Sequence, residues 1–308
     1  MNPYLYDQTL RLAGGAARLP ETVRSRHTAY LTVSQRADGG FAGREGDSDL
    51  YYTSFALRGL FILGALYGDV AQRATAFLRS KLAGQETIVD FLSLIYGATL
   101  LNLSADIDVF EDQAANWQDA VADELELLRR DDGGYAKANA GRASSTYQSF
   151  LVILCRQLID RPLPHPDRMI EFIHSQRSED GGFRDIRVAK RGGTNPTAAA
   201  IGALKMLDAL DTQVAKDTIE FLAGMQTAEG GLRANTRIPV ADLLSTFTGV
   251  LTLADLDGLN SVDTSAIQRY VWQTEEPKGG FHGASWDQGV DVEYTFYGLG
   301  GAALLAEQ

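Results

Sequence analysis

Residues 35–53 read QRADGGFAGREGDSDLYYT, and the glycine pair followed by a large apolar residue within this stretch recurs along the chain. The pattern occurs at residues 39–41, 133–135, 181–183, 230–232 and 279–281. The steps between copies are 94, 48, 49 and 49 residues, and 94 is twice 47. The spacing therefore predicts a degenerate copy near residue 86, in KLAGQETIVDFLSLIYG, and six repeats of about 48 residues, a length typical of helical repeat proteins.

Each glycine pair stands between two kinds of helical segment. In QVAKDTIEFLAGMQ, residues 213–226, the apolar side chains recur at helical spacing on one face, which predicts a surface helix. After the loop comes a segment that is apolar nearly all round, such as YYTSFALRGLFILGALYG, residues 51–68. Such a segment suits a helix that is buried on more than one side. The repeats therefore predict six pairs of helices.

We expect an all-α protein whose six pairs close into an α/α toroid of six inner and six outer helices. An open solenoid needs polar terminal repeats, whereas the last segment, YTFYGLGGAALLAEQ, is as apolar as the central ones. The predicted organisation is one domain over residues 1–308 with an N-terminal extension of about 20 residues. All the glycine turns would then lie at one end, and the loops after them would surround one mouth.

Two local predictions concern the helix ends. The glycine pairs are expected to adopt positive φ as C-terminal caps of the outer helices. Asp49, Asp242 and Asp291 each stand four residues before a threonine, and an acidic residue there suits the N-terminus of the following helix.

Composition excludes several classes of partner and site. A net charge of −12 and a pI near 4.8 oppose broad binding of nucleic acid or anionic membranes. Cys155 is the only cysteine, so neither an intrachain disulfide nor a four-thiolate zinc site is possible. No uninterrupted apolar run is long enough to span a membrane, and the N-terminus does not resemble a signal peptide. We expect a cytoplasmic protein.

The unit of Gln, an acidic residue, Gly-Gly and an aromatic residue resembles the repeats of protein prenyltransferase β subunits of the Rab geranylgeranyltransferase and farnesyltransferase type. It is more distantly similar to the barrel domains of class II terpene cyclases. The resemblance covers nearly the whole chain and is clearest in DVEYTFYGLGGAALL, residues 291–305, and VADLLSTF, residues 240–247. It implies an α/α toroid with an aromatic-lined funnel for an isoprenoid.

Aromatic residues on the predicted inner helices agree with such a funnel, although they could equally fill the interior of the barrel. Trp286, in the last loop, is added to the set as a residue at the mouth. The candidate funnel residues are Tyr51, Tyr52, Phe55, Tyr147, Phe247, Trp286 and Tyr297.

The resemblance also implies where zinc would bind. The family's ligands lie in an Asp-x-Cys motif and an Asp-x-x-His-Thr motif, which correspond to residues 242–244 and 291–295. Leu244 has no lone pair, and Tyr294 is a poor substitute for imidazole, so one ligand of three remains. We therefore expect no metal or other cofactor, and the alternative is an unusual ligand set from Asp242, His282, Asp291 and Glu293.

The family's diphosphate-binding histidine and Arg-x-x-Lys pair are absent, since their positions fall at Gly192, Thr236 and Pro239. The same two loops nevertheless carry a group of basic residues in an otherwise acidic protein, and such residues are the usual phosphate partners. The alternative is a solvated rim that pairs with neighbouring aspartates. The candidates are Arg184, Arg187, Lys190, Arg191, Arg233 and Arg237.

Glu293 stands at the central position of the cyclases' Asp-x-Asp-Asp-Thr motif. Beside Asp291 and an apolar funnel its pKa would be raised, and it could act as an acid. The leading hypothesis is a prenyltransferase β-like protein that binds an isoprenoid or prenyl diphosphate, with an α-subunit-like protein or a second copy as partner; whether it is an enzyme is left open. Its catalytic candidates are Asp242, Asp291, Glu293 and Tyr294. The alternatives are a class II-like terpene cyclase that uses Glu293 or Asp291 as acid, and a non-catalytic interaction module.

Overall fold

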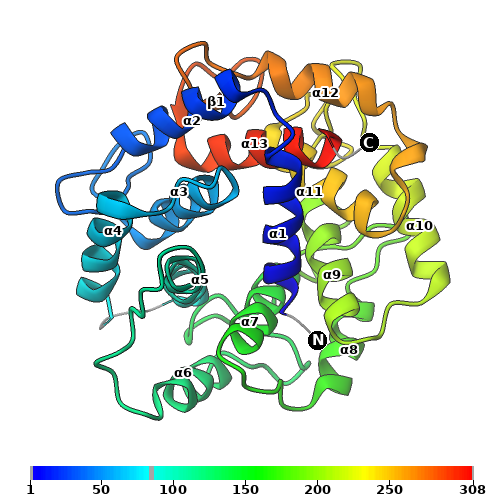
Figure 1. Cartoon of the computed structure of the whole chain (residues 1–308). Coiled ribbons are helices and arrows are strands. Elements are labelled where there is room, and N and C mark those ends of the chain that lie inside the picture. The colour runs from blue at the N-terminus through cyan, green and yellow to red at the C-terminus, as the bar shows by residue number, and fades with distance from the viewer. Residues whose placement is uncertain (1–2, 83–86, 307–308) are drawn as a thin grey trace. The chain divides into compact units, whose positions relative to one another are not determined.

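A computed structural model describes residues 3–82 and 87–306, which form thirteen α-helices (Figure 1). The degenerate copy predicted near residue 86 includes residues 83–86, which lie outside the described residues. The helices are α1 Tyr4–Ala16, α2 Glu21–Val33, α3 Leu50–Ile62, α4 Gly68–Ser80, α5 Ile88–Ala105, α6 Trp117–Glu126, α7 Thr146–Leu158, α8 Pro166–Ser175, α9 Thr194–Met206, α10 Thr212–Ala223, α11 Leu243–Asp255, α12 Thr264–Gln273 and α13 Val292–Ala306. A short 3₁₀ helix, Leu259–Ser261, and an antiparallel pair of two-residue strands, β1 Phe281–His282 and β2 Val290–Asp291, complete the described chain.

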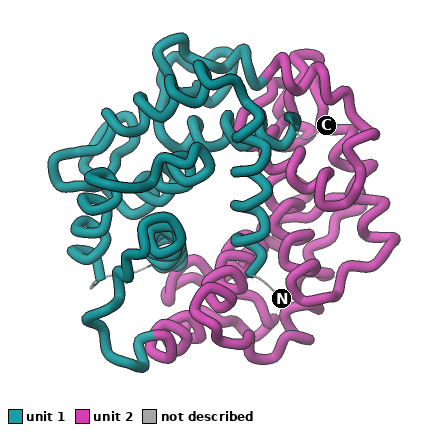
Figure 2. The backbone as a smooth tube through the Cα atoms, viewed as in Figure 1, with its two compact units in different colours: residues 1–117, 271–308 teal, residues 118–270 magenta. Residues whose placement is uncertain are grey.

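The contacts divide the chain into two compact units (Figure 2). Unit 1 comprises residues 1–117 and 271–308, and unit 2 comprises residues 118–270. In unit 1, α3 packs against α5 and α13; in unit 2, α9 packs against α7 and α11. The expectation of a single domain stays a prediction.

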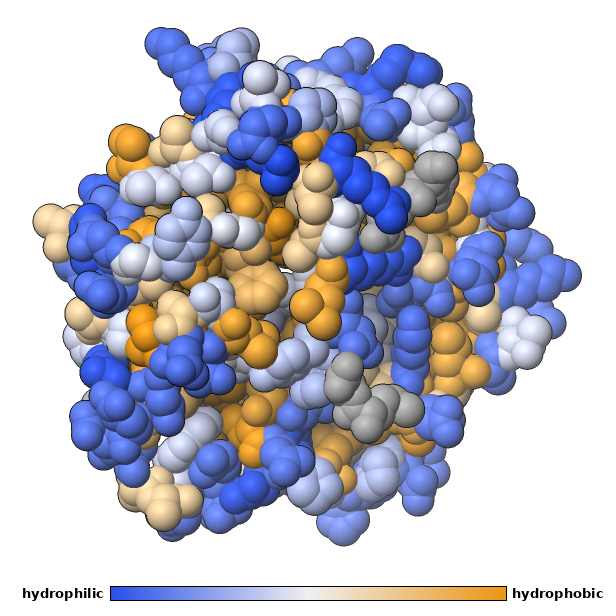
Figure 3. Space-filling view, in the orientation of Figure 1, coloured by the Kyte–Doolittle hydropathy of each residue, from blue (hydrophilic) through white to orange (hydrophobic). Residues whose placement is uncertain are grey.

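The helices from α2 to α13 form the six predicted pairs, in which an even-numbered helix precedes a loop and an odd-numbered helix follows it. The helices after the loops are the more buried ones, as their apolar composition predicts: in α13, twelve of fifteen residues are buried. Figure 3 shows the corresponding pattern on one face of unit 1, with hydrophobic residues over α3, α5 and α13 and hydrophilic residues over α2. The predicted N-terminal extension contains α1, which packs on α13 and α3.

α5 is the one helix in the described part of the chain that is long and apolar enough to cross a membrane by composition. More than half of its residues are buried within the fold, at 56%. Its apolar character is therefore that of a core helix packed between α3 and α4.

The glycine pairs adopt the predicted backbone conformation but not at the predicted place. The first glycine of each of the five pairs has positive φ, between 87° and 103°. However, α2 ends at Val33 with Ser34 as its right-handed cap, and Gly39 lies in a separate turn closed by its N–H on the Arg36 carbonyl, at 3.0 Å. The assignment of the pairs as helix C-caps is therefore wrong, because several residues separate each helix end from its turn.

The glycines are needed because the turns pack tightly on the next even-numbered helix. A Cβ added to Gly39 would lie 2.1 Å from the carbonyl oxygen of Arg73 in α4, and one added to Gly40 would lie 2.6 Å from the ring of Phe77. A side chain would therefore collide with backbone at the first position and with a ring at the second. The next three pairs meet Phe172, Phe221 and Tyr270 in the same way, whereas the last pair meets Tyr30 of α2.

A hydroxyl in the first turn of the following helix holds the residue after each glycine pair. The backbone N–H of Phe41 donates to Thr53 Oγ1 at 2.9 Å, and the N–H of Phe281 donates to Thr295 Oγ1 at 3.3 Å. Equivalent bonds reach Ser149, Thr197 and Thr246. The predicted aspartate caps are confirmed, since Asp49, Asp242 and Asp291 each accept a hydrogen bond from a backbone N–H three residues later.

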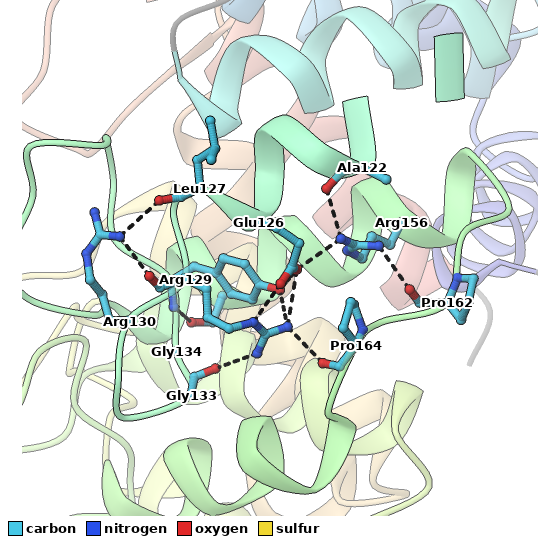
Figure 4. A network of polar contacts seen from close by, with 12 residues as sticks. Ala122, Glu126, Leu127, Arg129, Arg130, Gly133, Gly134, Arg156, Pro162 and Pro164 are labelled. Carbon is cyan, nitrogen blue, oxygen red and sulfur yellow. Dashed lines mark hydrogen bonds and ion pairs between the residues drawn. The ribbon is translucent and has the colours of Figure 1, made fainter. Parts of the chain in front are cut away.

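A partly buried ionic network joins α6 to α7 in unit 2 (Figure 4). Glu126 accepts hydrogen bonds from Arg129 at 2.8 Å, from Arg156 at 2.9 Å and from the Tyr135 hydroxyl. Burial raises the pKa of Glu126, but the bonds from Arg129 and Tyr135 outweigh it and leave that pKa below its usual value. Every charged group of this network is paired within the fold, so the network is structural.

Candidate functional site

The aromatic residues of α3 and α13 form a cluster within unit 1. The ring centroids of Tyr51 and Phe55 are 5.0 Å apart, and Phe55 lies 5.2 Å from Tyr297 and 5.7 Å from Phe296. Phe55, Phe296 and Tyr297 are buried, and Tyr51 is half-buried. We call these four residues the aromatic cluster. It brings together three of the candidate funnel residues, and Tyr52 adjoins it with its ring 5.3 Å from that of Tyr51.

Glu293 lies at the edge of the aromatic cluster, in the first turn of α13. Its Oε1 atom accepts hydrogen bonds from the hydroxyls of Tyr51, at 2.6 Å, and Tyr297, at 3.2 Å. Burial raises the pKa of Glu293, the Tyr51 bond opposes that rise, and the negative charge of Asp291 adds to it. The pKa of this carboxyl group beside an apolar surface is therefore above that of an exposed glutamate.

Arg44, from the first loop, joins the last loop to the start of α13. Its guanidinium donates to Asp287 at 2.8 and 2.5 Å and to Asp291 Oδ2 at 3.0 Å. The Arg44 hydrogen bonds lower the pKa of Asp287 to about 2. Burial raises the pKa of Asp291, against the opposing charge of Arg44. Asp291 therefore has two partners: it pairs with Arg44 through Oδ2, and its Oδ1 atom accepts a hydrogen bond from the backbone N–H of Tyr294 at 2.9 Å.

Arg58 is a second cation in this region, seven residues after Tyr51 on α3. Its guanidinium carbon lies 4.7 Å from the ring centroid of Phe55, 4.6 Å from that of Tyr96 in α5 and 5.8 Å from that of Phe296. Its Nε atom is buried and forms no hydrogen bond. A guanidinium surrounded by three rings is held by cation–π attraction.

The residues at the family's zinc positions do not fit the metal. Leu244 offers no atom that could bind a metal. The ring of Tyr294 lies beside Gly283, and the guanidinium carbon of Arg44 lies 5.5 Å from the centroid of this ring. Across residues 3–82 and 87–306, no group of three or more His, Cys, Asp and Glu side chains is arranged to hold a metal ion. We derive no chemistry through zinc.

The remaining candidates of the catalytic and funnel sets, apart from Trp286, lie in unit 2. Asp242 caps α11 through the N–H and hydroxyl of Ser245, at 2.7 and 2.8 Å, and burial raises its pKa. Phe247 is buried one turn further along α11, and Tyr147 is partly exposed at the start of α7. Trp286, in the last loop of unit 1, is 68% exposed, unlike the aromatic cluster.

The basic residues of the fourth and fifth loops separate into two groups. Arg184 donates to the carbonyls of Ser175, Gln176 and Arg177, and Arg233 donates to the carbonyl of Gly224, so both support their own loops. The others are exposed, and Arg191 bridges the two loops through the Thr236 hydroxyl at 2.9 Å. These exposed residues are Arg187, Lys190, Arg191 and Arg237.

Sequence reasoning missed Arg44, Asp287 and Arg58. Arg44 and Asp287 are 243 residues apart, so no local pattern connects them. Arg58 did leave a signal, since it is a lone charge in the apolar helix SFALRGL. A charged residue on an otherwise apolar helix is a candidate for pairing or for function.

Comparison with known proteins places this geometry in a family context. The model of the prenyltransferase alpha-alpha toroid domain matches residues 7–97, 93–208 and 193–308. The protein farnesyltransferase subunit beta of Schizosaccharomyces pombe is 27% identical over 176 residues, which are 55% of this chain and 45% of that protein. The chain thus spans less than half of the length of that relative.

Solved structures share the fold at low sequence identity. Protein geranylgeranyltransferase-I of Candida albicans complexed with GGPP superposes with a TM-score of 0.69 at 14% identity, over 90% of this chain and 89% of that chain. The type II terpene cyclase MstE from Scytonema gives 0.60 at 13% identity, over 96% and 98%. An α-1,6-mannanase from a Salegentibacter species gives 0.65 at 13%, over 93% and 98%. At these identities the matches show the α/α-toroid fold.

Proposed function

Because the chain belongs to the prenyltransferase α/α-toroid family, we propose that it binds an isoprenoid or another long apolar ligand on the aromatic cluster. The observation that carries this proposal is the packing of four aromatic side chains from α3 and α13, with the Glu293 carboxyl group at their edge. Each methylene group buried against such a surface contributes roughly 0.8 kcal/mol. The related geranylgeranyltransferase was solved with GGPP, which is the same class of ligand.

Within unit 2, we propose separately that the exposed basic residues of the fourth and fifth loops bind a diphosphate. Lys190, Arg191 and Arg237 suit this role, because none of them is used, as Arg184 and Arg233 are, to hold loop carbonyls. The yeast relative is named as a β subunit, and we propose an α-type subunit or a second copy of this chain as partner.

The proposal includes no zinc, since Leu244 and Tyr294 replace two of the three family ligands. Native mass spectrometry of the purified full chain tests ligand, metal and assembly together. We expect a co-purified apolar molecule and well under one zinc ion per chain. Stoichiometric zinc would overturn the metal-free site and direct attention to His282 and Glu293, and failure to bind any isoprenoid would overturn the ligand.

A second candidate function is acid catalysis of a terpene cyclisation, in which Glu293 protonates an alkene. The position of its carboxyl at the edge of the aromatic cluster, with a raised pKa, favours this role. The expected product is a cyclised hydrocarbon made from an uncharged polyene. Absence of turnover with a panel of such polyenes would remove this candidate.

A further inference from the structure

Arg58 differs from every comparable arginine in the described chain. Six arginines have a buried Nε atom without a hydrogen-bond partner, and five of them use their terminal nitrogens elsewhere. Arg24 binds Glu21, Arg26 binds Glu275, Arg79 binds Glu111, Arg156 binds Glu126, and Arg233 binds the Gly224 carbonyl. Of these six, Arg58 alone forms neither a hydrogen bond nor an ion pair with a residue in 3–82 and 87–306.

The surroundings of Arg58 make unused donors unexpected. Guanidinium carries five N–H donors, and a cation removed from water is costly unless anions or acceptors meet it. The three rings offer cation–π attraction but accept none of those bonds in the plane of the guanidinium. The positive charge of Arg58 opposes the rise that burial causes in the pKa of Glu293, but Arg58 forms no hydrogen bond with this residue. The Oε1 atom of Glu293 accepts from the hydroxyls of Tyr51 and Tyr297 instead.

The terminal nitrogens of Arg58 remain available to something outside the chain. They form no bond to a described residue. Nε is a fully buried polar atom without a partner, whereas the two terminal nitrogens are not in that class. They therefore keep accessible surface next to Phe55 and Phe296 of the aromatic cluster. A planar fork of donors in this setting matches the two oxygens of a carboxylate or phosphate.

We propose that Arg58 binds the anionic oxygens, of a carboxylate or a phosphate, on a ligand whose apolar part packs on the aromatic cluster. The inference rests on the proposed function for that apolar part. The position of Arg58 also disfavours a carbocation intermediate beside Phe55 and Phe296. Arg58 is itself positive, and it occupies the ring faces that would stabilise such a cation. Arg191 and Arg237 of the fourth and fifth loops are a separate candidate for anion binding, and the experiment below distinguishes them from Arg58.

The test compares farnesol, farnesoate and farnesyl monophosphate as probes of equal apolar length, measured by calorimetry on the full chain. We expect one or both anions to bind about 10- to 100-fold more tightly than farnesol, as charge-assisted hydrogen bonds imply. In Arg58→Met this difference falls below about twofold while farnesol binding is retained. Arg58→Lys keeps part of it, because the charge remains without the fork. The preferred anion identifies the headgroup.

Matched controls separate a ligand site from a structural role. Arg24→Met removes an arginine that also has a buried Nε, and it should keep the full preference for anions. Arg58→Met should be as stable as the wild type or more so, because it replaces a half-buried charge that has no ion-pair partner by an apolar chain of similar length. A structural cation would instead lower the melting temperature.

Three outcomes would overturn the inference. The anion preference could survive in Arg58→Met, or it could be lost only in the double variant Arg191→Met/Arg237→Met, which would assign it to the loops. The wild type could also bind farnesol and the anions equally, in which case isoprenoid binding stands and the Arg58 site does not. If none of the probes binds, the proposed function fails as well.

Discussion

At the scale of single residues, the site in unit 1 depends on side chains that meet from opposite ends of the sequence. Tyr51 and Glu293 are 242 residues apart and share a hydrogen bond of 2.6 Å. The sequence motif pointed to Glu293, but its tyrosine partners and the Arg44 ion pair with Asp291 follow only from three-dimensional packing. The motif thus identified a carboxyl group, whereas the burial and the neighbours that shift its pKa follow from the fold.

The change Glu293→Gln separates acid chemistry from binding. Glutamine keeps an oxygen that can accept from Tyr51 and Tyr297, so we expect ligand affinity and thermal stability to remain nearly unchanged. Product formation, if Glu293 is the acid, should be abolished. Wild-type turnover should rise as pH falls through the raised pKa of Glu293, because only the protonated form can donate.

Asp291→Ala is the matched comparison, since Asp291 caps α13 and holds Arg44. It should lower the free energy of unfolding by about 1 kcal/mol, a typical value for a lost N-cap. Product analysis by gas chromatography and thermal unfolding measure the two effects. An active Glu293→Gln enzyme would leave the acid role without support.

At the scale of helices and turns, the repeat period predicted the six pairs, the buried character of the odd-numbered helices and the aspartate caps. It could not predict where the glycine turns lie relative to the helix ends. The turns are placed by tertiary packing: Gly40 lies against the ring of Phe77, and Gln35 binds the carbonyls of Gly39 and Val70. Both contacts reach α4, which belongs to the next repeat.

Gly39→Ala and Gly46→Ala measure this packing directly. Both glycines have nearly the same positive φ, 89° and 87°, but a Cβ at Gly46 meets nothing within 4 Å, whereas one at Gly39 meets the Arg73 carbonyl. Gly46→Ala should therefore cost about 1 kcal/mol, for the backbone conformation alone. Gly39→Ala should cost about 3 kcal/mol, since overpacking adds to that term. Equal losses in urea unfolding would show that the turn does not depend on this contact.

At the scale of the whole molecule, the last repeat contacts the first. Each glycine turn from the first repeat onward packs on a later even-numbered helix, but the last turn packs on α2, the first helix of the series. A Cβ at Gly279 would lie 2.7 Å from Cβ of Tyr30 and 3.0 Å from the Arg26 carbonyl. Within unit 1 this contact joins the last repeat directly to the first, which the terminal repeats of an open solenoid would not do.

His27 holds that closing contact and makes it sensitive to pH. Its Nδ1 atom accepts the Gly280 N–H at 3.1 Å, and its Nε2 atom lies 2.9 Å from Glu275, which also pairs with Arg26. An Nδ1 atom that accepts must be unprotonated, so the folded protein holds His27 neutral. Burial lowers its pKa, and the hydrogen bond to Glu275 opposes this without cancelling it.

A lowered pKa in the folded state means that the unfolded chain binds the proton more readily. The stabilisation from His27 is therefore complete above its ordinary pKa of about 6.5 and is lost as pH falls from there toward the lower value of the folded state. Between pH 7.5 and 5 the wild type should lose about 1 kcal/mol more stability than His27→Gln, the worth of one hydrogen bond, because glutamine does not titrate. The other three histidines titrate in both proteins, so the comparison with this variant cancels their contribution to the pH dependence of stability.

Urea unfolding at the two pH values, with amide exchange of residues 279–282, measures this effect. Exchange should accelerate at low pH in the last loop of the wild type beyond the intrinsic change, and less so in His27→Gln, because the Gly280 N–H loses its acceptor when His27 is protonated. If both proteins lose the same stability between pH 7.5 and 5, the closing contact does not depend on His27, and the packing of Tyr30 on Gly279 and Gly280 must hold the last repeat to the first.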